Sequence, residues 1–336
     1  MREFKNILVT GGAGFIGSNF ILNFLKKNKN TNIINIDNLT YAANLGNLKA
    51  IENAANYKFI ECDISDFNKI SSIFTEEKID CVVNFAAESH VDRSIDNPNI
   101  FLKTNVIGTA NLLNASLLVF ENNKEFLFHH ISTDEVYGSL SFEDKPFKET
   151  NQYLPNSPYS ASKASSDHLV RAWNHTYGLP TTLSNCSNNY GPFQHPEKLI
   201  PFVIKQIITD KPITLYGDGL NIRDWLYVED HCRAIQKIIF NGEIGSVYNI
   251  GGINEKSNVD LVHTICDEVD KLLSKKTSSK ELITFIKDRP GHDRRYAIDN
   301  TKIQEELNWQ PKETFNSGII KTVSWYLKNQ DWLLEK

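Results

Sequence analysis

Residues 6–27 read NILVTGGAGFIGSNFILNFLKK, and this stretch decides the fold. The β-branched run ILVT predicts a buried strand, and the periodic apolar residues after the glycines predict an amphipathic helix. Between them, Gly11, Gly12, Gly14 and Gly17 fit both GxGxxG and GxxGxxG. Glycines here permit a tight turn and let backbone N–H groups approach a pyrophosphate at the positive end of the helix. The stretch therefore indicates a dinucleotide-binding βαβ unit.

The next segments extend this unit. NIINID predicts a second strand that ends at Asp37, twenty positions after Gly17. A carboxylate there accepts hydrogen bonds from the adenosine ribose and repels a 2′-phosphate, so the cofactor predicted is NAD. Asp63 follows the strand-like KFIEC, where it is a candidate helix cap and a candidate contact of the adenine amino group, two roles that are compatible. Ala86 and Ala87 end a fourth strand, where small side chains either admit the cofactor or are good packers.

Composition narrows the class of protein. The chain has 336 residues, is 40% hydrophobic and carries a net charge of -5 with its basic residues dispersed, which argues against a nucleic-acid or membrane partner. Five cysteines, an odd number without a CxxC pair, predict reduced thiols and no metal site. No signal-peptide pattern or membrane-spanning run is visible, so we expect a cytoplasmic enzyme.

A second set of motifs carries chemistry. STDEVYG follows an apolar strand and places Asp134 and Glu135 beside the hydroxyl of Thr133. Further on, Tyr159 and Lys163 in YSASK stand four residues apart, on one face of a helix. An ammonium group near a phenol favours the phenolate, so we expect a lowered Tyr159 pKa and a general base. The alternative is that Asp134 caps a helix and Glu135 is a solvated charge.

GGAGFIGS, STDEVYG and YSASK, in this order, resemble the extended short-chain dehydrogenase/reductase family. AAESHVDRSI, NCSNNYGP, EKLIP, NIRDWLYVEDHC and RPGHDRRYAID resemble the dTDP-glucose 4,6-dehydratases within it. The resemblance covers about residues 5–310 and implies an α/β fold: a doubly wound, Rossmann-type parallel sheet with a smaller C-terminal substrate lobe. It also implies a cytoplasmic hydro-lyase of deoxysugar and dTDP-rhamnose biosynthesis, and a homodimer formed through helices near 98–121 and 158–177.

The reaction implied by the resemblance converts dTDP-glucose to dTDP-4-keto-6-deoxyglucose. Tyr159, supported by Lys163, would act as base while C4 is oxidised, and Thr133 would align the C4 oxygen. Glu135 would take the C5 proton and Asp134 would protonate the departing C6 hydroxyl. This elimination needs one ionised and one protonated carboxyl group, so adjacent carboxyl groups with divergent pKa values suit it.

The resemblance also implies two sets of binding residues. The NAD site would comprise Gly11, Gly14, Phe15, Ile16, Gly17, Asp37, Asn38, Leu39, Thr40, Asp63, Ile64, Phe85, Ala86, Ala87, Thr104, Tyr159, Lys163 and Asn189. The sugar-nucleotide site would comprise Ser89, Thr133, Asn188, Lys198, Leu199, Thr214, Tyr216, Arg223, Asn258, Arg289 and His292. In the second set Tyr216 would stack on the pyrimidine, and Arg223, Arg289 and His292 would grip the diphosphate. Two departures from the family pattern are Ala43 in place of glycine and Thr214 in place of proline.

We expect residues 1–187 to form the NAD-binding domain, with a returning segment at about 228–256. Residues 188–227 and 257–336 would form the sugar-nucleotide domain. A UDP-glucose 4,6-dehydratase remains an alternative, since uridine and thymidine nucleotides differ by one methyl group and one hydroxyl. A UDP-sugar 4-epimerase needs neither the C5 base nor the C6 acid. A non-enzymatic NAD sensor should have lost Tyr159, Lys163 or the two carboxylates, and all of these are present.

Overall fold

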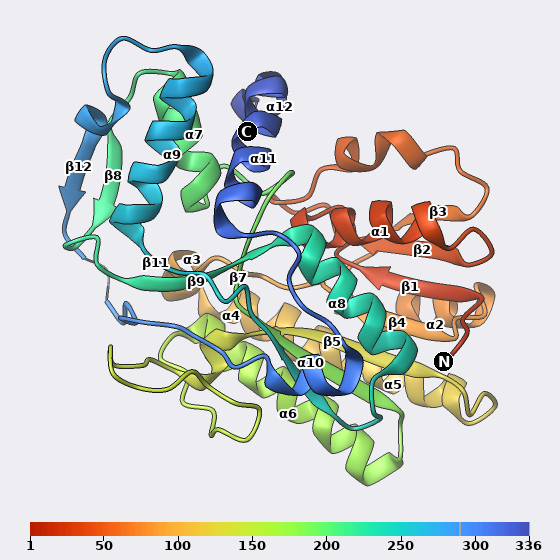
Figure 1. The fold of residues 1–336 in the computed structure, drawn as a ribbon. Helices are drawn as coiled ribbons and strands as arrows, with labels where there is room; N and C mark the ends of the chain where they lie inside the picture. The colour runs from red at the N-terminus through yellow and green to blue at the C-terminus, as the bar shows by residue number, and fades with distance from the viewer. Residues whose placement is uncertain (289, 336) are drawn as a thin grey trace.

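A seven-stranded parallel sheet forms the centre of the computed structural model, which describes residues 1–288 and 290–335 (Figure 1). Its strand order is β10-β6-β5-β4-β1-β2-β3. The strands are β1 (Asn6–Thr10), β2 (Asn32–Asp37), β3 (Tyr57–Glu61), β4 (Cys81–Asn84), β5 (Leu127–Thr133), β6 (Thr181–Cys186) and β10 (Val247–Ile250). The chain winds outward from β1 to β3, then restarts beside β1 with β4 and winds the other way. The predicted doubly wound sheet is confirmed, and β10 returns to it beside β6 as expected.

Helices cover both faces of this sheet, as the alternation of apolar side chains along β1 requires. Ile7 and Val9 pack in one core with α1 (Phe15–Lys27) and α8 (Val228–Asn241), and Leu8 points into the core of the opposite face. That second core is closed by α2 (Phe67–Glu76), α5 (Thr109–Phe120) and α6 (Pro158–Tyr177). The 3₁₀ segment η1 (Leu45–Ile51) lies against α1, and α10 (Thr301–Leu307) packs on β10.

The helix expected near 98–121 is interrupted, which corrects the prediction of one regular α-helix. After α3 (Val91–Asp96) come α4 (Pro98–Phe101) and then a π-helical segment, η2 (Leu102–Gly108), which leads into α5. In η2 the Asn105 amide accepts from the Glu88 N–H (2.9 Å) and donates to the Glu88 carbonyl (3.0 Å). These bonds tie the wider turn to the loop after β4 and so fix Thr104 beside that loop. The helix predicted at 158–177 is α6 and is confirmed.

The second lobe lies beside the carboxyl edge of the sheet, at the upper left in Figure 1. It contains a three-stranded sheet of β11 (Glu255–Ser257), β9 (Ile222–Tyr227) and β7 (Asn188–Tyr190), and a parallel pair, β8 (Ile213–Tyr216) and β12 (Ile283–Ile286). Its helices are α7 (Leu199–Ile208), α9 (Asn258–Leu273), α11 (Phe315–Lys328) and α12 (Gln330–Leu334), and η4 (Ser279–Leu282) is a 3₁₀ turn. Another 3₁₀ turn, η3 (Asp134–Tyr137), belongs to the first lobe and follows β5 directly. This lobe has its own apolar core, centred on Val203, Ile265 and Val323.

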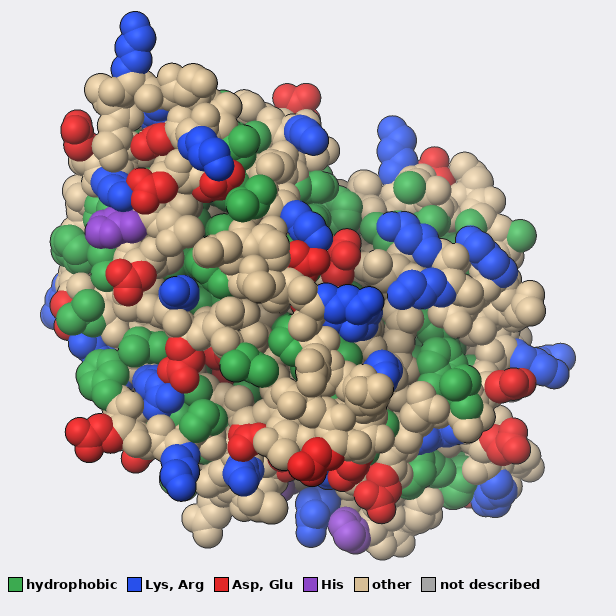
Figure 2. All heavy atoms as spheres, viewed as in Figure 1, with side chains coloured by type: hydrophobic (Ala, Val, Ile, Leu, Met, Phe, Trp, Pro, Cys, Tyr) green, Lys and Arg blue, Asp and Glu red, His purple; other side chains and the backbone are tan. Residues whose placement is uncertain are grey.

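Acidic and basic side chains are both spread over the face seen in Figure 2. All five cysteines are buried and unpaired. Within the described residues, no helix is long and apolar enough to cross a membrane, and no group of three metal-ligating side chains is present.

Candidate active site

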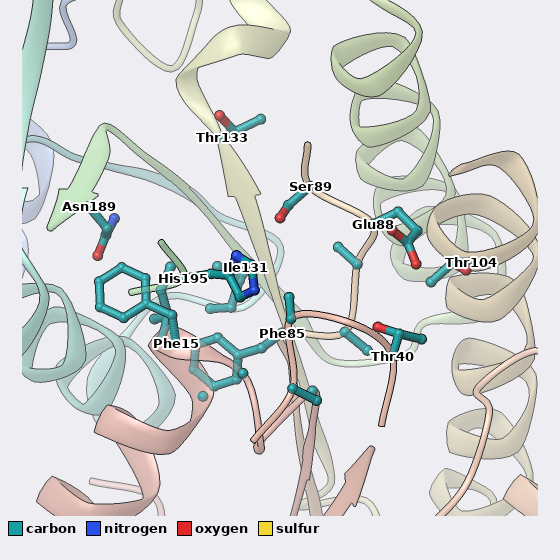
Figure 3. A pocket seen from close by; sticks show the side chains of 18 of the residues that line it. Phe15, Thr40, Phe85, Glu88, Ser89, Thr104, Ile131, Thr133, Asn189 and His195 are labelled. Atoms are coloured by element: carbon teal, nitrogen blue, oxygen red, sulfur yellow. The ribbon is translucent and has the colours of Figure 1, made fainter. Parts of the chain in front are cut away.

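The carboxyl ends of the parallel strands meet at one edge of the sheet, and the residues that follow them line one cavity (Figure 3). Ligands bind at this edge in doubly wound sheets, beside the point where the strand order reverses. From the predicted sets the cavity gathers Gly11, Gly14, Phe15, Ile16, Gly17, Asp37, Asn38, Thr40, Asp63, Ile64, Phe85, Ala86, Ala87, Ser89, Thr104, Thr133, Asp134, Glu135, Tyr159, Lys163, Asn188, Asn189 and Lys198. In Figure 3, Thr40 and Thr104 lie on the side opposite Phe15 and Asn189. Segments from both halves of the chain therefore meet around one space.

The glycine turn has a steric reason. Gly11 has φ +66°, and a Cβ on it would lie 2.8 Å from the backbone of Ala86. A Cβ on Gly17 would lie 2.4 Å from the carbonyl oxygen of Gly11. Helix α1 begins after Gly14, which offers no side-chain cap, so an anion can accept from the N–H groups of the first turn.

Asp37 is held at the end of β2 by its own loop. Its carboxylate accepts from the N–H groups of Ala13 (3.0 Å) and Leu39 (2.9 Å). Burial raises its pKa, and these hydrogen bonds oppose the rise. Leu39 shapes the loop but does not line the cavity. A glycine turn, an uncapped helix start and a fixed carboxylate together fit the pyrophosphate and adenosine ribose of NAD.

Asp63 lines the cavity beyond β3, where its carboxylate accepts from the Ser65 N–H (2.8 Å). The cap of α2 is Asp66, which accepts from the Lys69 N–H (3.1 Å). The helix-cap alternative for Asp63 is therefore wrong, because the cap of α2 stands three residues later, at Asp66. Its place in the cavity leaves the adenine contact as a prediction.

The two carboxyl groups after β5 occupy different environments. Thr133, rather than Asp134, caps η3: its Oγ1 accepts from the Glu135 N–H (3.3 Å). The same hydroxyl donates to Asp134 Oδ1 (3.4 Å). Asp134 is 2% exposed, and its Oδ2 is buried without a hydrogen-bond partner in the described part of the chain. Burial, and then the charge of Glu135, raise the pKa of Asp134 well above its usual range. Asp134 is therefore a buried acid beside a second carboxyl group.

Tyr159 and Lys163 line the cavity from α6, as their spacing predicted. Lys163 Nζ donates to the Ile131 carbonyl (2.7 Å) and lies 3.3 Å from His130 Nε2. The predicted lowering of the Tyr159 pKa is wrong for this structure. Burial raises that pKa well above its usual value and the charge of Glu135 adds to the rise, whereas a hydrogen bond with Thr133 opposes it. Burial also lowers the pKa of Lys163. The environment thus favours the neutral phenol.

Part of the predicted substrate set lies in the same cavity. Ser89, Asn188 and Lys198 line it, and Lys198 Nζ donates to the Ser89 carbonyl (3.1 Å). Asn188 Oδ1 is buried, with no hydrogen-bond partner among the described residues. A buried acceptor at a cavity wall is available to a ligand hydroxyl.

The rest of that set lies in the second lobe. Leu199, Thr214, Tyr216, Arg223, Asn258 and His292 do not line the cavity, and Arg289 lies outside the described residues. The Tyr216 hydroxyl donates to Asp92 Oδ2 (3.3 Å), and its ring meets His292 edge-on at 6.2 Å. The Arg223 guanidinium lies 4.4 Å from the centre of the Tyr296 ring and donates to the Asp293 carbonyl (2.9 Å). The nucleotide contacts of this set stay predictions.

Several lining residues were missed by the sequence reasoning, namely Glu88, Ser132, Cys186, Ser187, Gln194, His195 and Glu197. Glu88 and Glu197 are next to the predicted residues Ser89 and Lys198. Their motifs were therefore identified, but these two side chains were not predicted to line the cavity. No pattern of spacing indicates which neighbour in such a loop turns inward.

Comparison with known proteins matches the family model for GDP-mannose 4,6 dehydratase to residues 8–322. A dTDP-glucose 4,6-dehydratase of Salmonella typhimurium is 54% identical over 340 aligned residues, covering 97% of this chain and 94% of the relative. The structure of a dTDP-glucose 4,6-dehydratase of Bacillus anthracis in complex with NAD is 46% identical, covers 98% of each chain and has a TM-score of 0.87. The DesIV dTDP-glucose 4,6-dehydratase of Streptomyces venezuelae, with NAD and TYD bound, is 40% identical, with 97% of this chain and 98% of that chain covered and a TM-score of 0.90.

Proposed function

Because this chain belongs to the GDP-mannose 4,6 dehydratase family of extended short-chain dehydrogenases/reductases, we propose that it dehydrates dTDP-glucose and we assign each step to its residues. The reaction is a hydro-lyase reaction that yields dTDP-4-keto-6-deoxyglucose, with NAD as cofactor. When bound, NAD would accept the hydride from C4 and return it to C6. All other steps are proton transfers, and they fall to side chains on β5, η3 and α6.

The observation that carries the proposal is the pair of carboxyl groups at the start of η3. For C4 oxidation Tyr159 has to be ionised: its phenolate takes the proton of the C4 hydroxyl, and Glu135 takes the C5 proton that the ketone makes acidic. Asp134, kept protonated by burial, gives its proton to the departing C6 hydroxyl, and Glu135 then returns a proton to C5. A 4-epimerase needs neither of the last two groups.

The proton balance of this cycle requires a proton to pass from Tyr159 to Asp134, and Thr133 lies between them. Each turnover leaves one proton on Tyr159 and removes one from Asp134, since the C4 oxygen ends as a ketone and the C6 oxygen leaves as water. Both groups are buried. The Thr133 hydroxyl donates to Asp134 and hydrogen-bonds Tyr159, so it offers a route for returning the proton.

The second lobe takes the nucleotide. Tyr216 stacks on the pyrimidine, and Arg223 and His292 bind the diphosphate with Arg289. Support comes from β9, which pairs with the cavity-lining strand β7, and from the contact between Tyr216 and Asp92 of α3. We retain the division into an NAD-binding domain, 1–187 with 228–256, and a sugar-nucleotide domain, 188–227 with 257–336.

The proposal also covers the oligomeric state and the cellular location of the enzyme. The helical segment 98–120 exposes Leu102 (49%), Ile107 (54%) and Leu118 (51%), an apolar surface that supports a homodimer through this segment and α6. Equilibrium sedimentation of Ile107→Glu, compared with the unaltered chain, tests the homodimer. If the unaltered chain sediments as a monomer, the homodimer is contradicted. The enzyme acts in the cytoplasm, in deoxysugar biosynthesis of the dTDP-rhamnose kind.

The substrate is tested by assaying the purified protein with dTDP-glucose and UDP-glucose under identical conditions. We expect the 4-keto product from dTDP-glucose, bound NAD carried through purification, and no net NADH. Faster turnover of UDP-glucose would move the assignment to the uridine enzyme. Stoichiometric release of NADH would contradict a hydride that is borrowed and returned.

A further inference from the structure

Three loops that line the cavity converge on the carboxylate of Glu197. The Tyr41 hydroxyl, in the loop after β2, donates to Glu197 Oε1 (3.0 Å). The Arg93 guanidinium, on α3 after β4, lies 3.5 Å from the centre of the Tyr41 ring, and its Nε is 3.8 Å from Glu197 Oε2. Glu197 itself belongs to the loop that precedes α7. One carboxylate thus connects segments that are more than a hundred residues apart in the chain.

Two histidines complete the cluster. His90 Nε2 lies 3.8 Å and His195 Nδ1 lies 3.9 Å from Glu197 Oε2, and the Tyr41 ring meets His195 edge-on at 5.6 Å. The Glu197 side chain is only 16% exposed, so these contacts are partly shielded from water. Burial, and then the charge of Glu197, raise the pKa of Tyr41, so the phenol remains a hydrogen-bond donor at neutral pH.

The cluster stands at the boundary between the two sides of the cavity. Thr40 and Ala42, which flank Tyr41, line the cavity beside Asp37 on the adenosine side. His195 and Glu197 line the same cavity beside Lys198, on the side assigned to the sugar nucleotide. No proton transfer of the proposed cycle uses Tyr41, Arg93 or Glu197. Their contacts therefore call for a role other than chemistry.

We propose that Glu197, Tyr41 and Arg93 form a clasp that joins the adenosine-side loop to the loop before α7 and slows the release of NAD. The proposal rests on the proposed function in one respect: a cofactor that lends and regains its hydride in each turnover has to stay bound. These three are positioning residues. They hold the loops over the cofactor and do not touch the reacting atoms.

The size of the effect follows from the kind of contact. Exposed ion pairs contribute little, but a partly buried hydrogen bond to a charged group contributes enough to change a rate about tenfold or more. Because the Tyr41 hydroxyl acts through its contact with Glu197, removing both groups should cost no more than removing Glu197 alone.

The test measures NAD release from the purified holoenzyme without substrate, by dilution into an enzyme system that consumes free NAD. We expect Glu197→Gln and Tyr41→Phe each to release NAD about tenfold faster, and the double variant to be no faster than the faster single one. Glu305→Gln, at an exposed position on α10, is the matched control. Tyr41→Phe removes one oxygen atom, so it keeps the test available if Glu197→Gln does not fold.

Unchanged release in both variants, or effects that multiply in the double variant, would overturn the clasp. A raised KM for dTDP-glucose with unchanged NAD release would also overturn it and assign Glu197 to the substrate. The release assay contains no sugar, so failure of dTDP-glucose turnover in the unaltered enzyme would count against the proposed function and leave the clasp standing.

Discussion

The cofactor side of this molecule and the side proposed to bind the nucleotide are built differently. On the cofactor side, the ends of separate parallel strands bring Gly11, Asp37 and Thr133 to one edge, and each is placed by its own strand and turn. On the nucleotide side, Tyr216 is held through Asp92 of the other lobe, and Arg223 through the Asp293 carbonyl and the Tyr296 ring. At the sheet edge, each site residue is positioned by its own strand and turn. In the second lobe, the site residues are positioned by contacts with side chains and backbone groups of other segments.

The largest effect should come from the cofactor side. Tyr159→Phe removes the proposed base for C4 oxidation, so we expect kcat to fall about 10²–10⁴-fold, the range typical of general acid–base groups. No NADH absorbance should build up when dTDP-glucose is added to the variant. Tyr177→Phe, at a half-exposed phenol on the same helix, should retain full activity and serves as control. Near-normal turnover of Tyr159→Phe would move the base to another residue.

The same contrast decides what the sequence could predict. Gly11, Asp37 and Thr133 were predictable, because local motifs fix both the strand and the turn that follows it. The pKa of Tyr159 was not, since it depends on burial and on Glu135, which reaches the phenol only in three dimensions. The π-helical turn at Asn105 was likewise invisible, because its cause is a pair of hydrogen bonds to Glu88, seventeen residues earlier.

The adjacent carboxyl groups give a second test on the cofactor side. Glu135→Gln keeps the shape but loses the C5 base, so C4 oxidation should survive while exchange of the C5 hydrogen with solvent deuterium falls about a hundredfold. Asp134→Asn should keep C5 exchange and slow loss of the C6 hydroxyl by a similar factor. Mass spectrometry in D₂O separates the two outcomes, with exposed Glu143→Gln as control. Dehydration at the unaltered rate in both variants would make these carboxyl groups structural.

A smaller effect concerns the buried network beneath the cofactor side. Asp167 accepts from Ser132 Oγ (2.7 Å) and lies 3.5 Å from His130 Nε2, and burial raises its pKa to about 7 against an ordinary value of 3.8. Between about pH 4 and pH 7 the folded protein therefore holds a proton that the unfolded chain has lost. This group makes stability fall as pH rises through that window, by at most about 1.4 kcal/mol per pH unit.

Asp167→Asn should remove that contribution, so the difference in unfolding free energy between variant and unaltered protein should shift in favour of the variant from pH 4 to pH 7. Urea unfolding at several pH values measures it, with exposed Asp96→Asn as control. Parallel stability profiles would show that Asp167 is ionised in the folded protein over the whole range.

The smallest effect should come from the nucleotide side, where it sharpens the contrast. If Tyr216 stacks on the pyrimidine, Tyr216→Ala should raise the KM for dTDP-glucose about tenfold, since stacking of a base on an aromatic ring contributes about 1–3 kcal/mol. Tyr216→Phe keeps the ring and loses the bond to Asp92, which spans 3.3 Å between partly exposed groups, so its KM should change about twofold or less. NAD release should be unchanged in both variants, because the contact between Tyr216 and Asp92 is not one of the contacts of the clasp. Steady-state kinetics beside the NAD-release assay measures both quantities. Faster NAD release in Tyr216→Ala would mean that the two sides are coupled through Asp92 and α3, and the independence of the sheet edge would then be wrong.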